Sequence, residues 1–255
     1  MKVRFLGSGD AFGSGGRFNT CIHLEGRQAS CLIDCGASSL IAMRKFGVDP
    51  NGIGAIFITH LHGDHFGGLP FVILDAQLVS RRTAPLHIAG PPGLRDRMTA
   101  AQEVLFPGSS KADRRFAIEY CELTTGVAHV VNRWKVTPYE MRHPCGAPPF
   151  ALRIACEGLT ICYSGDTEWT DELIPAARDA DLFIAESYFF DKKIKFHLDF
   201  TTLAAHLPEI AARRVILTHM SQDMLGRAGE TGLECAYDGL MMTLEPAPAA
   251  CQGPA

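Results

Sequence analysis

Short apolar runs alternate with turn residues and longer amphipathic stretches along the chain. Runs rich in β-branched and apolar residues predict strands over residues 2–7, 20–24, 31–34, 55–59, 86–89, 116–121, 134–140, 150–156, 159–163, 181–185 and 215–218. Apolar residues at helical spacing predict helices over 37–46, 69–80, 93–105, 170–179 and 201–212, the last kinked or split at Pro208. Adjacent strands come first and helices join later, which favours packed sheets with helices outside over a strict βαβ winding.

No linker-like segment divides these elements, and a chain of 255 residues can bury a large core. We therefore expect a single domain over residues 1–245. The Pro- and Ala-rich residues 246–255 predict a disordered tail.

The composition is ordinary for a soluble globular protein, with 47% apolar and 20% charged residues. The net charge is −4 and no block of like charges occurs. This argues against a protein that holds long nucleic acid by neutralising its phosphates. A small anionic substrate remains possible, since one or two well-placed cations would suffice to bind it.

The nine cysteines are odd in number and form no C-x-x-C pair, which favours small buried thiols over disulfides or a redox motif. The amino end reads as a strand and not as a signal peptide, and no apolar run is long enough to cross a bilayer. We expect a reducing cytoplasm and no membrane contact.

The densest chemistry follows the predicted strand 55–59, where His60, His62, Asp64 and His65 lie within six residues. Imidazole nitrogens and carboxylate oxygens are ligands that zinc and related divalent metals prefer. The first two histidines share one side of an extended segment, and the other two ligands lie beyond the turn at Gly63. Two ions are therefore sterically natural, each completed by residues from elsewhere in the chain. The alternative is a polar loop that is merely rich in histidine.

Three more candidate ligands stand at turns that follow predicted strands. His143 follows the strand 134–140, Asp166 lies in Ser-Gly-Asp-Thr after the strand 159–163, and His219 ends the strand 215–218. Taken singly, each has a structural alternative: His143 could be a turn histidine, Asp166 a turn residue or helix cap, and His219 a satisfied core residue.

Taken together and in this order, Thr-His-Leu-His-Gly-Asp-His, a lone His, Ser-Gly-Asp-Thr and Thr-His resemble the metallo-β-lactamase superfamily of hydrolases. The resemblance covers nearly the whole chain. It implies an α/β fold, a four-layered αββα sandwich with the site along one edge. It also implies two divalent ions, one bound by His60, His62 and His143, the other by Asp64, His65 and His219, with Asp166 bridging both. Zinc is expected, although manganese and iron suit the same mixed nitrogen and oxygen ligands.

Two further residues resemble the phosphodiesterase branch, which includes tRNA 3′-processing endonucleases and small cyclic-phosphate phosphodiesterases. Glu186 ends the strand 181–185, and His197 precedes His219 by 22 residues. In that branch a histidine in this region assists phosphodiester cleavage and a glutamate supports it. The implied catalytic residues are Asp64, His197 and Glu186. A histidine kept protonated by a carboxylate can donate to a strongly basic leaving alkoxide.

Two differences from the tRNA-processing members of this branch limit the class of substrate that we expect. Only 23 residues separate His143 from Asp166, too few for the tRNA-gripping arm that many tRNA-processing relatives insert there. The His-Ser-Thr form of the acid motif is altered to His197-Leu198-Asp199. We therefore expect a small cyclic phosphate, nucleotide or related diester ahead of RNA 3′ processing. The other hypotheses are a lactonase, thioesterase or β-lactamase with the same site and, least favoured, a non-catalytic ligand-binding relative. A homodimer is expected on family grounds alone.

The glycine-rich segment 7–17 does not match G-x-G-x-x-G and precedes a strand, which argues against a dinucleotide loop. It predicts a flexible turn that borders the site, with Arg17 and Asn19 as either substrate contacts or plain turn residues.

Overall fold

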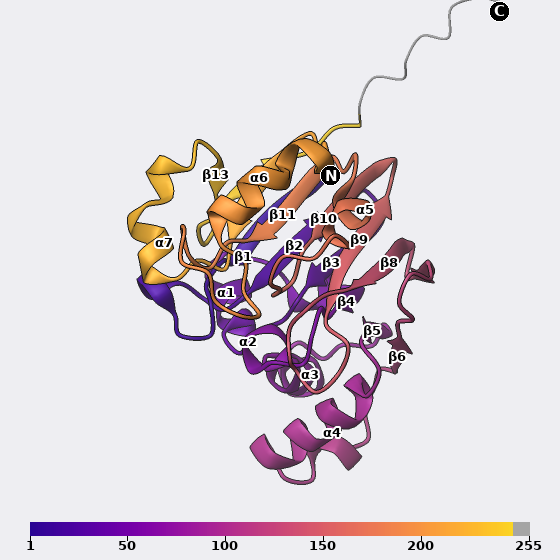
Figure 1. Cartoon of the computed structure of the whole chain (residues 1–255). Coiled ribbons are helices and arrows are strands. Elements are labelled where there is room, and N and C mark those ends of the chain that lie inside the picture. Colours follow the sequence, from indigo (N-terminus) through magenta and orange to yellow (C-terminus); the bar gives the residue numbers. More distant parts are fainter. Residues whose placement is uncertain (247–255) are drawn as a thin grey trace, which may run out of the picture.

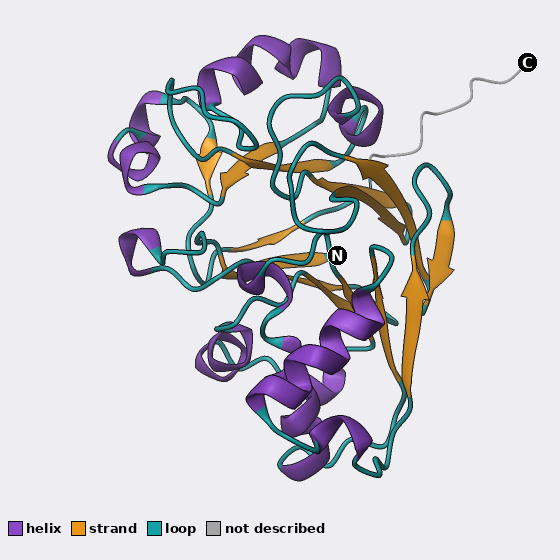
Figure 2. Cartoon of the chain, turned by 60° about the horizontal axis from the view of Figure 1, so that its bottom comes forward, coloured by secondary structure: helices purple, strands orange, loops and turns teal. Residues whose placement is uncertain are grey.

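The computed structural model describes residues 1–246, and its strands form two seven-stranded sheets that face each other (Figure 1, Figure 2). The first sheet has the order β14-β1-β2-β3-β4-β5-β6. Its strands are β14 (Met241–Thr243), β1 (Lys2–Gly7), β2 (Cys21–Glu25), β3 (Ser30–Ile33), β4 (Ala55–Phe57), β5 (Leu86–Gly90) and β6 (Ile118–Glu122). Strands β3 to β6 run parallel, and the remaining pairs are antiparallel.

The second sheet has the order β13-β12-β11-β10-β9-β8-β7. Its strands are β13 (Glu234–Cys235), β12 (Val215–Thr218), β11 (Leu182–Glu186), β10 (Leu159–Tyr163), β9 (Phe150–Cys156), β8 (Trp134–Glu140) and β7 (His129–Val131). Strands β10 to β13 run parallel, whereas β7 to β10 form an antiparallel meander.

Helices cover the outer face of each sheet, which gives the four-layered αββα sandwich that the resemblance implies (Figure 2). The helices are α1 (Ser39–Lys45), α2 (Gly63–Phe66), α3 (Leu69–Leu78), α4 (Leu94–Leu105), α5 (Leu173–Ala177), α6 (Phe200–Ile210) and α7 (Gln222–Gly226), with short 3₁₀ turns at η1 (Ser14–Gly16), η2 (Pro50–Gly52), η3 (Ser109–Lys111) and η4 (Ala228–Glu230). Side chains of α1, α3 and α4 pack on the first sheet, and those of α5, α6 and α7 on the second. The central core lies between the sheets and includes Phe5, Trp134 and Tyr163.

The parallel strands bring distant parts of the sequence to one edge of the sandwich. In a parallel sheet all carboxyl ends meet at the same edge, and loops after those ends carry ligand sites. His60 follows β4 of the first sheet, and His219 follows β12 of the second. The His219 backbone N–H donates to the carbonyl of Ser8, just after β1, at 3.1 Å, which links the two sheets at this edge.

The structure differs from the predicted elements mainly in short or terminal ones. Strands β7, β13 and β14 and helices α2 and α7 were not predicted, and α5 is shorter than the predicted helix 170–179. The break expected at Pro208 is absent, because this proline lies in the last turn of α6 and little helix remains to be disrupted. Within residues 1–246 no helix is both long and apolar enough to cross a bilayer. The predicted tail, residues 246–255, lies outside the described residues except for residue 246.

Candidate active site

Three histidines from two sheets form the first group of candidate ligands. His60 and His62 follow β4, His143 follows β8, and their ligand atoms all lie within 4.8 Å of one another. His143 Nε2 is 3.0 Å from His62 Nδ1. The structure therefore brings together the three residues that the sequence analysis assigns to one ion.

A second group joins Asp64 and His65 of the short helix α2 to Asp166 and His219. His65 Nε2 lies 3.2 Å from an oxygen of Asp64 and 3.3 Å from His219 Nε2. His219 Nε2 is 3.3 Å from the same Asp64 oxygen. This group again matches the expected set.

Asp166 lies between the two groups. Its Oδ1 is 3.2 Å from His65 Nε2 and its Oδ2 is 3.5 Å from His219 Nε2. The same Oδ2 lies 3.9 Å from both His60 Nε2 and His143 Nε2. The carboxylate thus reaches both sets, which is the position that a bridging ligand needs.

The hydrogen bonds behind the rings fix which nitrogen faces inward. His65 Nδ1 donates to Asp34 Oδ2 at 2.6 Å, and His143 Nδ1 donates to the Phe196 carbonyl at 2.8 Å. The Thr59 hydroxyl donates to Asp34 and so accepts from His60 Nδ1, 3.1 Å away. Each of these rings therefore turns its Nε2 toward the centre, the nitrogen that would bind metal.

These residues fit a pair of divalent cations. His60 Nε2 and Asp166 Oδ1 are buried without a hydrogen-bond partner among the described residues, an arrangement that is costly unless another group satisfies it. Zinc–nitrogen bonds of about 2.0–2.1 Å place tetrahedral ligands roughly 3.3 Å apart. The ring nitrogens at 3.0 and 3.3 Å match that spacing, and burial reinforced by His65 holds the pKa of His60 well below its ordinary value, so this ring is neutral.

Local backbone strain marks the same edge. Asp34 and His219 adopt φ values of 58° and 54°, in the left-handed region that residues with a Cβ rarely occupy. Before Asp166, Gly165 has φ +60°, and a Cβ there would lie 2.7 Å from the Phe150 carbonyl oxygen. Such strain clusters at functional sites when the surrounding fold enforces it.

His197 and Glu186 lie beside the second group. The fully buried Glu186, at the end of β11, forms a hydrogen bond through Oε1 with His197 Nδ1, while its Oε2 accepts the Thr167 backbone N–H at 2.7 Å. Burial lowers the pKa of His197, but the hydrogen bond and charge of Glu186 outweigh it and raise that pKa above its ordinary value. His197 is thus held in place and biased toward its protonated form.

A cavity of about 210 Å³ opens onto these groups. It is lined by His62, Asp64, His143, Asp166, His197 and His219, together with Asp10, Ala11, Phe12 and Tyr188. Asp10, Ala11 and Phe12 belong to the glycine-rich segment that the sequence analysis predicts to border the site, whereas Tyr188 was not identified from the sequence. The Tyr188 ring stacks on His197 with centroids 4.7 Å apart, and Phe12 is 82% exposed at the cavity.

Arg17 and Asn19 have structural partners and do not line this cavity. Arg17 Nη1 donates to the Ala236 carbonyl at 2.6 Å, and Asn19 Nδ2 donates to the Asp10 carbonyl at 3.0 Å. Of the two hypotheses for these residues, the structure supports turn residues that hold the glycine-rich segment.

Asp34 is a further site residue that the sequence analysis missed. This buried carboxylate accepts a hydrogen bond from His65 Nδ1 at 2.6 Å. It also accepts from the backbone N–H and from the hydroxyl of Thr59, both at 2.8 Å. Nothing local marks it, since its partners follow 25 and 31 residues later.

We expect Asp34→Asn to weaken metal binding by about 10–100-fold, because an amide cannot accept from all three donors and removes the charge that orients His65. Competition with a chromogenic chelator measures this. Asp75→Asn is the matched control, since Asp75 is also a buried carboxylate but pairs with Arg44. Equal metal affinity of Asp34→Asn and the unmodified chain would refute this role.

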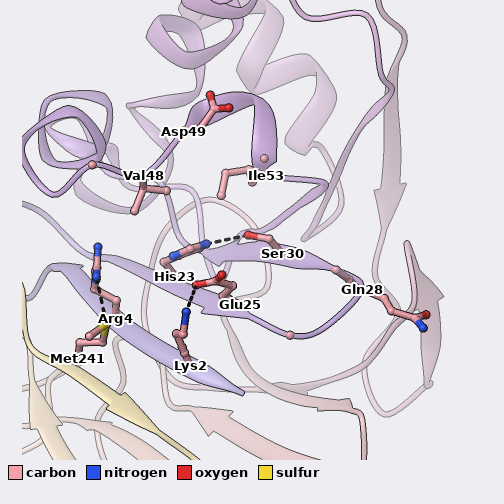
Figure 3. Close-up of a pocket in the computed structure, with 14 residues that line it drawn as sticks. Lys2, Arg4, His23, Glu25, Gln28, Ser30, Val48, Asp49, Ile53 and Met241 are labelled. Carbon is pink, nitrogen blue, oxygen red and sulfur yellow. Dashed lines mark hydrogen bonds and ion pairs between the residues drawn. The ribbon is translucent and has the colours of Figure 1, made fainter.

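A larger cavity, of about 510 Å³, lies elsewhere (Figure 3). It is lined by Lys2, Arg4, His23, Glu25 and Ser30 at the opposite ends of the strands, and by Asp49, Val48 and Ile53 of the neighbouring loop. Its cations and carboxylates balance, and Lys2 pairs with Glu25 at 3.4 Å. The chemistry therefore favours the smaller cavity as the active site.

His23 in this larger cavity gives a pH-dependent prediction. Burial lowers its pKa to about 4, and its Nε2 lies 2.7 Å from the Ser30 hydroxyl. The unfolded chain takes up this proton near its ordinary pKa of about 6.5, so stability is lost as pH falls from there toward 4.

Between about pH 7 and pH 4.5 the unfolding free energy of the unmodified chain should fall as His23 resists protonation. We expect this fall to be smaller in His23→Gln, by on the order of 2 to 3 kcal/mol. Urea unfolding of both proteins at each pH measures the difference, and metal ligands common to both cancel. An identical acid sensitivity in the two proteins would show that His23 does not contribute.

A family model described as "Anti-Pycsar protein Apyc1" matches residues 1–235. Among curated proteins, a ribonuclease Z of Agathobacter rectalis is 25% identical over 271 residues, covering 88% of this chain and 89% of that protein. A ribonuclease Z of Geobacillus kaustophilus is 27% identical and covers 89% of this chain and 91% of its own length.

Solved structures agree. Human tRNase Z, short form, superposes with a TM-score of 0.78 at 26% identity, covering 96% of this chain and 100% of that one. The metallo-β-lactamase fold protein YhfI from Bacillus subtilis has a TM-score of 0.77 at 19% identity over 94% and 98% of the two chains, which supports the fold alone. The chain is therefore a metal-dependent hydrolase of the metallo-β-lactamase fold, on the phosphodiesterase and tRNase Z-like branch, and it belongs to the Anti-Pycsar protein Apyc1 family.

Proposed function

We propose that this protein is a dinuclear metal-dependent phosphodiesterase that hydrolyses small cyclic phosphates, nucleotides or related diesters. The observation that carries the proposal is that His197, held by the buried Glu186, lines the same cavity as the candidate metal ligands. A role against Pycsar, which the family description names, belongs to the same proposal.

In this proposal His60, His62 and His143 hold one cation, Asp64, His65 and His219 hold the second, and Asp166 bridges them. Zinc fits this ligand set, as do manganese and iron. When bound, the cations supply a nucleophile from water and neutralise charge on the phosphate oxygens. Asp64 contributes both as a ligand and as a carboxylate at the cavity wall.

His197 acts as the general acid. The carboxylate of Glu186 holds Nδ1, which leaves Nε2 as the ring nitrogen free to donate a proton. An alkoxide leaving group is strongly basic, so protonation lowers the barrier to its departure. Hydrolysis of a β-lactam or a lactone does not obviously need this proton donor. A lactonase, thioesterase or β-lactamase activity is therefore less favoured than a phosphodiesterase activity. A non-catalytic ligand-binding role is least favoured.

The size of the cavity and the length of the chain support a small substrate. The cavity of about 210 Å³ lies below the usual range of roughly 300–1,000 Å³ for ligand sites. About 224 residues, 88% of this chain, fill the 271 positions aligned with the Agathobacter rectalis protein, so that relative carries about 47 positions that this chain lacks. The shorter chain therefore has fewer residues with which to hold a large RNA.

RNA 3′ processing is the second candidate function, and the curated relatives favour it directly because they are named ribonuclease Z. A small-molecule substrate, a homodimer and a cytoplasmic location remain parts of the first proposal.

A substrate panel on the metal-loaded chain tests the choice. We expect kcat/KM for a cyclic nucleoside monophosphate to exceed that for a precursor tRNA, a lactone and a β-lactam. Faster cleavage of precursor tRNA at its 3′ side would establish the second function instead. Turnover of the lactone or β-lactam alone would contradict both.

A further inference from the structure

A third cavity, of about 260 Å³, lies between α4 and β6 and shares no lining residue with the active-site cavity. Three of its lining residues come from one face of α4, two from the segment that follows, and two from β6. They are Arg95, Thr99, Gln102, Ser110, Arg114, Ile118 and Tyr120. Neither the proposed function nor the comparisons assign this cavity a role.

The lining is cationic, although the Glu103 carboxylate accepts hydrogen bonds from the hydroxyl and the backbone N–H of the lining residue Ser110. It contains two arginines and no carboxylate, and neither guanidinium forms an ion pair within residues 1–246. The Nη2 of Arg114 donates to the carbonyls of Ser109 and Ser110 at 2.9 and 3.3 Å, while its buried Nε has no acceptor in the described chain. These backbone contacts fix the Arg114 guanidinium without neutralising its charge.

The buried face of α4 includes one polar residue at this cavity, Gln102. Leu94 and Met98 are buried at the spacing of one helix face, and Gln102 continues that face with only 5% exposure. Its side-chain amide forms no hydrogen bond with another described residue. Its donor and acceptor are therefore free to contact a molecule that enters the cavity.

The two arginines share this cavity with Tyr120. Arg95 lies 5.9 Å from the Tyr120 ring centroid. Burial raises the pKa of the Tyr120 phenol, and the charges of Arg114 and Arg95 both oppose that rise. Both guanidiniums thus line the same cavity as the Tyr120 ring, and Arg95 lies over the face of that ring.

We infer that this cavity binds the phosphate group of a small phosphomonoester. Arginine forks match phosphate oxygens in charge and geometry, the Gln102 amide supplies a further donor, and the Tyr120 ring offers a face for the organic part. A volume of about 260 Å³ admits a phosphate with a small substituent and excludes a folded nucleic acid. No histidine, cysteine or carboxylate lines the cavity among the described residues, so the ligand is bound and not hydrolysed there.

Calorimetric titration of the metal-loaded full chain tests this, with inorganic phosphate and adenosine 5′-monophosphate as probes and adenosine as the uncharged comparison. We expect phosphate to bind at the proposed metal centre as well, so the variants must separate the two sites. We expect Arg95→Gln with Arg114→Gln to weaken one class of phosphate binding by about tenfold or more and to leave the other class intact. Arg115→Gln, an exposed neighbour outside the cavity, should retain both classes.

Hydrolysis of bis-nitrophenyl phosphate should be unchanged in all these variants, because the cavity is not part of the active site. If the double variant fails to fold, Arg95→Gln alone, at an exposed helix position, should still weaken the same class several-fold. Isotherms that are identical in every variant, or adenosine that binds as tightly as its monophosphate, would overturn the inference.

Discussion

Replacing His197 by alanine is expected to slow the hydrolysis of diesters with alkyl or ribose leaving groups by about 10²–10⁴-fold. Hydrolysis of bis-nitrophenyl phosphate should fall far less, because a nitrophenolate departs without protonation. The difference follows from the position of His197, which opens onto the cavity and is held by the buried Glu186. Steady-state kinetics on both substrates and metal analysis of the same preparations measure the effect.

His87→Ala is the matched control. His87 also pairs with a glutamate, Glu119, at 3.1 Å, but it lies on β5 and does not line the active-site cavity. It should retain both activities. Glu186→Gln should show the same substrate dependence as His197→Ala in a weaker form, since the ring loses its orienting charge but remains present. Equal losses on both substrates for His197→Ala would refute the general-acid role.

Asp166→Ala is expected to lower the metal content and to reduce phosphodiesterase activity by about 10³-fold or more. The reason is that this buried carboxylate reaches both histidine groups, with oxygens 3.2 Å from His65 and 3.9 Å from His60. Elemental analysis after reconstitution and dialysis gives the metal content, and circular dichroism shows whether the fold is kept.

Asp113→Ala controls for loss of a carboxylate, because Asp113 is exposed and distant in the fold from both ligand groups. Asp166→Asn keeps the shape of the side chain and separates loss of charge from loss of packing. Full metal content and full activity in both Asp166 variants would contradict its place between the two groups.

The sequence predicts the long elements of this fold well, because their apolar spacing is set by burial on one or both faces. It fails for β13 and β14, whose two and three residues carry no periodicity. β14 forms because Met242 pairs with Val3, at the other end of the chain. Such pairing is decided by tertiary packing and leaves no local pattern.

The candidate site divides in the same way. His60, His62, Asp64 and His65 are evident from the residues alone, since four ligands lie close together after one strand. His143, Asp166 and His219 required the resemblance, because each is an ordinary turn residue until the fold joins the two sheets. Asp34 and Tyr188 could not be found, since their roles exist only through contacts with His65 and His197.

The central claim is that seven side chains between His60 and His219 hold two cations. Anomalous diffraction from crystals of the zinc-reconstituted chain tests it most directly. We predict two peaks on either side of Asp166, one at about 2.0–2.1 Å from the nitrogens of His60, His62 and His143, the other bound by Asp64, His65 and His219. Peaks elsewhere, or no peak after full reconstitution, would contradict the account.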